Sequence, residues 1–188
     1  MPEYEHGRVR QLANSLEALG VAEELRDQIL AGGELLLRGA SPEHKAAWMR
    51  EAMGRMDAQL DAATRHAVLE KCACCLGGKR LQLSKAIAKE HATLEERIAA
   101  ANETRFVFGH SVSREADGRI LVCFSPEGQA NYNCVCLSKA KEPVSITYCY
   151  CCGGHVKHHL QIALGCRLSC TVRSRSEEHT SELQSPNT

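Results

Sequence analysis

The stretch Thr147-Tyr-Cys-Tyr-Cys-Cys-Gly-Gly-His-Val-Lys-His-His159 decides the fold prediction for the second half of this chain. Its alternating pattern predicts an extended segment in which Cys149 and Cys151 point to the same side. A turn is then predicted at Gly153, followed by a helix over residues 154–164. Because a helix N-terminus favours negative charge, thiolates beside it are expected to have lowered pKa values. The stretch therefore predicts a metal-binding or thiol-centred site.

The first part of the chain has the pattern of consecutive helices. Apolar residues recur at helical spacing over residues 2–102. Ser41 followed by Pro42 indicates a helix start, because serine caps the N-terminus and proline fits the first helical position. The Met and Trp side chains of the helix that follows are predicted to face a core. A long helix is predicted over residues 81–101.

Strand-like patterns replace the helical spacing after this region. Residues 105–112 and 119–124 are predicted to form a hairpin, because Ala116-Asp-Gly118 between them is a turn signal. Residues 144–150 and 167–172 are predicted to be extended as well. The expected fold class is α+β, with a small antiparallel sheet and one packed helix.

The predicted organisation has three parts. Residues 1–102 form the helical region, and residues 103–174 form a cysteine-rich α+β module. Residues 175–188 are set apart, because Arg175-Ser-Glu-Glu-His-Thr-Ser-Glu-Leu-Gln-Ser185 resembles the translation of a sequencing-library adapter. These residues are predicted to be a non-native tail, and the sheet is expected to lack its last strand.

Cysteine is used unevenly along the chain. All eleven cysteines lie between Cys72 and Cys170, and the first 71 residues contain none. Clustered cysteines without a secretory context indicate metal or redox work more often than disulfides. The isolated Cys123 and Cys166, together with Cys170, are predicted to be small buried hydrophobic residues.

The cysteine clusters predict a metal site. Two of them contain the C-x-x-C spacing, which lets both sulfurs bind one ion. Zinc is the expected ion, with an iron–sulfur cluster as the alternative, because tetrahedral thiolate sites suit both. The first ligands are expected to be the two C-x-x-C pairs, and the other members are alternates or form a second site. The full predicted ligand set is Cys72, Cys75, Cys134, Cys136, Cys149, Cys151, Cys152 and His155.

Two other functions are open. One is a hydrolase-like or thiol-dependent enzyme, with Cys149 or Cys151 as nucleophile and His155 as the group that moves protons. A zinc-protease helix is excluded, because Val156 stands where that motif has its glutamate. The other is a sensor or interaction module, which would leave an apolar patch exposed on the helical region.

The charge balance and the hydropathy pattern limit which classes of partner are expected. Lys and Arg number 23, as do Asp and Glu, so the formal net charge is zero and gives no nucleic-acid footprint. No apolar run reaches the length of a membrane span, and the polar N-terminus lacks a signal-peptide pattern. We expect a cytoplasmic protein that binds a small molecule and neither nucleic acid nor membrane.

A family resemblance rests on the residues Cys134-Val-Cys136, Pro143-Val-Ser-Ile-Thr-Tyr-Cys-Tyr-Cys-Cys-Gly-Gly-His155 and Leu164-Gly165. They resemble an uncharacterised bacterial family whose members join a helical half with a cysteine motif, here residues 72–75, to this module. The module is distantly similar to the small-molecule-binding 4-vinyl reductase domain and to L-2-amino-thiazoline-4-carboxylic acid hydrolase-like proteins. The resemblance implies an α+β domain with a cysteine-lined pocket for a metal or small ligand, and it transfers no activity.

Overall fold

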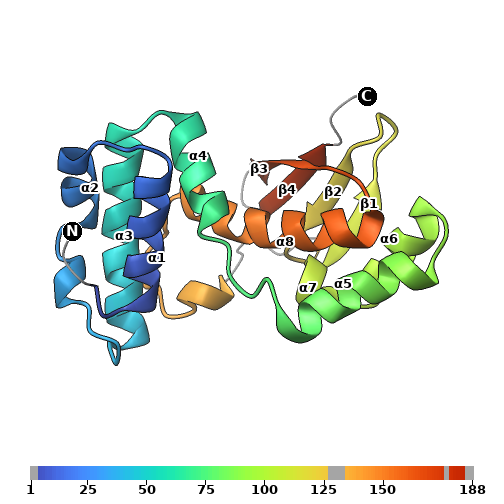
Figure 1. Ribbon diagram of the computed structural model, residues 1–188, viewed down its shortest axis with the longest axis horizontal. Coiled ribbons are helices and arrows are strands. Elements are labelled where there is room, and N and C mark those ends of the chain that lie inside the picture. The colour runs from blue at the N-terminus through green and yellow to red at the C-terminus, as the bar shows by residue number, and fades with distance from the viewer. Residues whose placement is uncertain (1–3, 127–133, 176–177, 185–188) are drawn as a thin grey trace. The chain divides into compact units, whose positions relative to one another are not determined.

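A computed structural model of the chain describes residues 4–126, 134–175 and 178–184 (Figure 1). The chain divides into two compact units. Unit 1 comprises residues 1–72 and 133–149, and unit 2 comprises residues 73–132 and 150–188. This division differs from the boundary expected at residue 102, because the chain returns to unit 1 after the hairpin and then leaves it again. No helix in the described residues is both long and apolar enough to cross a membrane.

Unit 1 is helical, and two of its helices begin at side-chain caps. The Ser41 Oγ accepts a hydrogen bond from the His44 backbone N–H at 3.2 Å, as predicted, and Asp61 Oδ1 accepts from the Thr64 N–H at 2.9 Å. The elements of the unit are α1 (Gly7–Ala18), α2 (Glu23–Leu30), η1 (Gly33–Leu35), α3 (Pro42–Gln59), α4 (Ala62–Lys71), η2 (Val135–Leu137) and η3 (Ile146–Tyr148).

The core of unit 1 includes the Met and Trp side chains of α3, which confirms their predicted role. Met53 and Met56 are fully buried, and Trp48 donates its indole N–H to the Ala31 carbonyl at 3.1 Å. Gly33 is required beside them, because a Cβ there would lie 2.7 Å from a methyl carbon of Val9. Close packing of α1 and α3 around the η1 turn therefore fixes this glycine.

Unit 2 is an α+β arrangement built on an antiparallel sheet. The sheet has the strand order β1-β2-β4-β3, and the predicted hairpin is confirmed, with Val112 opposite Val122. The elements are α5 (Gly78–Glu90), α6 (Leu94–Asn102), α7 (Arg105–Phe108), β1 (Ser111–Arg114), β2 (Ile120–Cys123), α8 (Cys149–Leu164), β3 (Ser169–Arg175) and β4 (Glu178–Gln184). Only the first residue of α8 belongs to unit 1.

Helix α8 packs across the sheet and supplies much of the unit 2 core (Figure 1). Leu160 and Phe108 are completely buried within this core. Gly153 allows the helix to approach β3, because a Cβ at this position would lie 2.7 Å from the Cys170 sulfur. The glycine therefore serves helix–strand packing rather than the turn that was predicted there.

Three predicted elements differ from the structure. Helix α8 begins at Cys149, so the prediction of an extended segment over residues 144–150 is wrong. Residues two apart on a helix do not share a face, and Cys149 and Cys151 therefore do not point the same way. The long helix expected over residues 81–101 is two helices, because Thr93 starts α6 with a capping box. The strand predicted at 105–112 begins with α7.

The last strand of the chain, β4, lies between β2 and β3 in the sheet. We expected a strand to be missing from this sheet, and residues 178–184 occupy that position as β4. These residues belong to the segment that resembles a translated adapter. The α+β class is confirmed, with helices first and then a small antiparallel sheet covered by one helix.

The buried position of Leu160 generates a stability prediction. Replacing Leu160, which is 0% exposed, by alanine leaves a cavity under the sheet and should lower the free energy of unfolding by about 2–5 kcal/mol. Leu35→Ala is the control, because Leu35 is 79% exposed and its loss should change stability by less than about 0.5 kcal/mol. Urea denaturation measures both. Equal effects of the two substitutions would contradict the described core.

Candidate functional site

Unit 1 gathers four of the predicted ligand cysteines from three separate segments. One ends α4, two lie in or beside η2, and one starts α8. These residues, called here the unit 1 thiol cluster, are Cys72, Cys134, Cys136 and Cys149. The remaining predicted residues, Cys75, Cys151, Cys152 and His155, belong to unit 2. The two C-x-x-C pairs are thus each divided between the units.

Arg8 of α1 contacts two members of the unit 1 thiol cluster, Cys72 and Cys136. One guanidinium nitrogen lies 3.2 Å from the Cys136 sulfur. The other donates to the Cys72 carbonyl at 3.3 Å and to the Gln11 side-chain oxygen at 3.1 Å. A guanidinium fixed in this way places a permanent positive charge beside a sulfur, which stabilises a thiolate relative to a thiol.

Cys72 is a buried thiol rather than a reactive one. Its sulfur donates to the Ser15 hydroxyl at 3.3 Å, and the residue is 5% exposed. Burial raises the pKa of the Cys72 thiol, and the Ser15 hydrogen bond and the Arg8 charge offset this only in part. Cys72 is therefore neutral at physiological pH.

Cys149 has the opposite property to the one predicted for a cysteine at a helix N-terminus. Burial, and then electrostatic repulsion from Cys134, raise the pKa of Cys149 to about 12. The expected lowering by the helix dipole is wrong here, because desolvation outweighs it. The electrostatic coupling also indicates that Cys134 and Cys149 lie near each other in unit 1.

His155 in unit 2 faces backbone oxygens. Its Nδ1 lies 2.8 Å from the Cys74 carbonyl and its Nε2 lies 3.1 Å from the Val107 carbonyl. Both ring nitrogens thus face carbonyl oxygens, and a neutral ring donates its one N–H to one of them. His155 braces the segment that follows α4, and in this arrangement it is not directed at a sulfur as a general base would be.

His159 braces the same segment one residue further along. It is completely buried, with Nε2 3.1 Å from the Cys75 carbonyl and Nδ1 3.0 Å from the Ser84 hydroxyl. Burial lowers the pKa of His159 to about 4, although the hydrogen bond to Cys75 opposes this. The ring is therefore neutral at pH 7 and carries one N–H, which we assign to Nε2 because the Cys75 carbonyl can only accept. The Ser84 hydroxyl, which contacts Nδ1, has a single hydrogen and also lies 3.0 Å from the Arg80 carbonyl.

Cys75 carries the backbone strain of this segment. Among the described residues other than glycine, it alone has a positive φ, of 60°. Such a conformation costs free energy for a residue with a side chain and needs neighbours that hold it. The two histidine contacts to residues 74 and 75 supply that restraint and leave the Cys75 side chain exposed.

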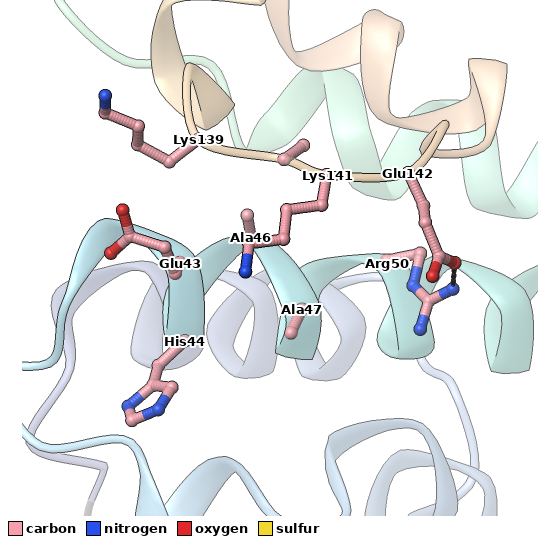
Figure 2. A pocket seen from close by; sticks show the side chains of 9 residues that line it. Glu43, His44, Ala46, Ala47, Arg50, Lys139, Lys141 and Glu142 are labelled. Carbon is pink, nitrogen blue, oxygen red and sulfur yellow. Dashed lines mark hydrogen bonds and ion pairs between the residues drawn. The ribbon is translucent and has the colours of Figure 1, made fainter.

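The described side chains do not converge on a metal position. No group of three or more His, Cys, Asp or Glu side chains in the described residues is arranged to hold an ion. A pocket of about 340 Å³ lies in unit 1 between α3 and residues 139–142, and no cysteine lines it (Figure 2). This pocket is therefore not the cysteine-lined pocket that the sequence predicted.

Arg8 and Ser84 were missed by the sequence reasoning. Arg8 lies 64 and 128 positions from the two cysteines it contacts, and no local pattern links them. His159 sits four residues after His155 on α8, and this spacing was the available signal that both rings share a face.

The comparison with protein families identifies a match over most of the chain. The model described as a family of unknown function (DUF6144) matches residues 14–174. No curated protein and no solved structure matches. The family description names no ligand, so the similarity to the 4-vinyl reductase domain and to the hydrolase-like proteins stays a prediction.

The lowered pKa of His159 predicts a stability change with pH. The ring takes up a proton near pH 6.5 when the chain is unfolded and only near pH 4 when it is folded, so stability should fall as pH decreases through this window. The loss should reach about 2–3 kcal/mol at pH 4, since one pKa unit corresponds to about 1.4 kcal/mol. In His159→Gln, which keeps a donor for the Cys75 carbonyl, urea denaturation at several pH values should show a shallower loss. An identical pH profile in both proteins would contradict the assignment.

Proposed function

We propose that this protein, which belongs to the DUF6144 family, carries a thiol redox centre in unit 1 whose reactive group is the Cys136 thiolate. The observation that carries the proposal is the contact of 3.2 Å between the Arg8 guanidinium and the Cys136 sulfur. Arg8 is held in place by two further hydrogen bonds, so its charge stays beside this sulfur. Cys149 is a poorer candidate for the nucleophile, because burial raises its pKa.

The neighbouring thiols supply the second half of a redox reaction. The Cys136 thiolate attacks the terminal oxygen of a hydroperoxide, the O–O bond breaks, and the alkoxide or hydroxide leaves and takes a proton from water. The resulting sulfenic acid condenses with a second thiol, releasing water and forming a disulfide. Cys134 is two residues from Cys136, and its coupling to Cys149 indicates a further thiol nearby. A reducing compartment such as the cytoplasm would regenerate both thiols.

Alkylation kinetics test this proposal. Iodoacetamide at neutral pH should modify Cys136 faster than Cys123, and Arg8→Gln should slow the reaction at Cys136 by about tenfold, the change in thiolate fraction that one pKa unit brings. Arg10→Gln is the matched control, because Arg10 is an exposed residue of the same helix. Peptide mass spectrometry measures the rate at each cysteine, and circular dichroism checks that both variants fold.

Two results would overturn the redox centre. One is a Cys136 rate no higher than that of Cys123 in the unaltered protein. The other is a rate at Cys136 that Arg8→Gln and Arg10→Gln leave equally unchanged.

Zinc binding by the unit 1 thiol cluster is the second candidate function. Four cysteines of one unit match the donor set of a structural zinc site, and an N–H donor on a thiolate sulfur is a common outer partner of such ligands. The buried thiols of Cys72 and Cys149 would release protons on binding a cation. Since the described sulfurs do not converge, they would have to move closer to hold the ion.

Elemental analysis tests the zinc proposal. Protein purified without a chelator should contain about one zinc per chain, and Cys134→Ser combined with Cys149→Ser should abolish it. Cys123→Ser is the control, since Cys123 lies on β2 of unit 2 and should leave the zinc content unchanged. Metal-free protein, or zinc that survives the double substitution, would overturn this candidate.

A further inference from the structure

The pocket of unit 1 is lined by charged side chains and by three alanines. It is formed by α3 on one side and by residues 139–142 on the other (Figure 2). The three alanines that line it, Ala46, Ala47 and Ala140, provide small apolar surface between the charges. Its volume of about 340 Å³ lies at the lower end of the range of small-molecule sites.

One end of the pocket is closed by an ion pair. Arg50 of α3 pairs with Glu142 of the facing segment, so the charges of these two residues neutralise each other (Figure 2). This contact ties residues 139–142 to α3 and fixes the separation of the two walls at that end. A ligand would therefore meet a partly preformed pocket rather than two independent segments.

The other end of the pocket carries an excess of positive charge. Lys139 and Lys141 extend from the facing segment, and Glu43 of α3 is the acidic residue near them (Figure 2). The Glu43 carboxyl has a lowered pKa, first through the backbone and Ser41 and then through the charges of these two lysines. Neither lysine forms a salt bridge in the described part of the chain. Two positive charges thus face one negative charge.

We infer that this pocket binds a small organic monocarboxylate, with its carboxylate near Lys139 and Lys141 and its apolar body against the lining alanines. The single uncompensated positive charge suits a monoanion, and the alanines favour a compact apolar group over a second charged one. The inference does not depend on the thiol centre, because no cysteine lines the pocket and the test below involves none.

The experiment is an NMR titration of the full chain with sodium benzoate and, separately, with inorganic phosphate. Benzoate should shift the amide signals of Ala46, Ala47 and Ala140 in a saturable manner. The double substitution Lys139→Ala/Lys141→Ala should weaken binding by at least about tenfold. One lost hydrogen bond to a charged group is enough to lower the affinity by that factor. Lys85→Ala/Lys89→Ala on the exposed face of α5 is the matched control and should bind as the unaltered protein does.

Glu43→Gln gives a readout that a structural role of the lysines would not produce. Removing the competing carboxylate should tighten benzoate binding severalfold, although the helix loses a favourable charge at its first turn. Equal weakening by the two lysine pairs, or no saturable shift at all, would overturn the inference. Phosphate binding as tightly as benzoate would overturn the monocarboxylate assignment. Phosphate has no apolar group, so equal affinity would mean that contact with the alanines contributes nothing to binding.

Discussion

The contact between the Arg8 guanidinium and the Cys136 sulfur is the constraint on which the unit 1 thiol cluster depends. The same side chain binds the Cys72 carbonyl at the end of α4, so one residue of α1 links two segments that are far apart in sequence. A buried or half-buried sulfur surrounded by apolar groups would remain a thiol. Arg8 places a positive charge beside Cys136, whereas burial raises the pKa values of Cys72 and Cys149. The cluster therefore contains thiols of unequal character.

Unit 2 shows a different use of polar side chains. His155 and His159 extend from α8 to the carbonyls of residues 74 and 75, where Cys75 has a left-handed backbone conformation. Because His159 is neutral and completely buried, its two hydrogen bonds satisfy groups that would otherwise be buried at a cost. His155, which the sequence suggested as a metal ligand or proton-transfer group, thus faces main-chain oxygens in this structure. Both rings lie against the carbonyls of residues 74 and 75 within unit 2.

Local signals in the sequence predicted local structure well. The Ser41 cap, the Met and Trp core positions of α3 and the 116–118 hairpin turn depend on neighbouring residues, and the structure confirms each of them. The start of α8 was missed, because alternating Tyr and Cys residues suit a strand until tertiary packing draws them into a helix. Gly153 had the pattern of a turn but permits a close helix–strand approach, which no local pattern reveals.

The candidate site was predictable only in its residue types. The cysteines stood out by spacing, whereas their division between two units and the role of Arg8 arise from contacts between distant segments.

The proposal that Cys136 is a thiolate is tested most directly by the ultraviolet thiolate absorbance of the reduced protein at neutral pH, compared with that of Cys136→Ser. We expect a thiolate signal that Cys136→Ser removes and that Arg10→Gln retains. Equal absorbance in the unaltered protein and in Cys136→Ser would contradict it.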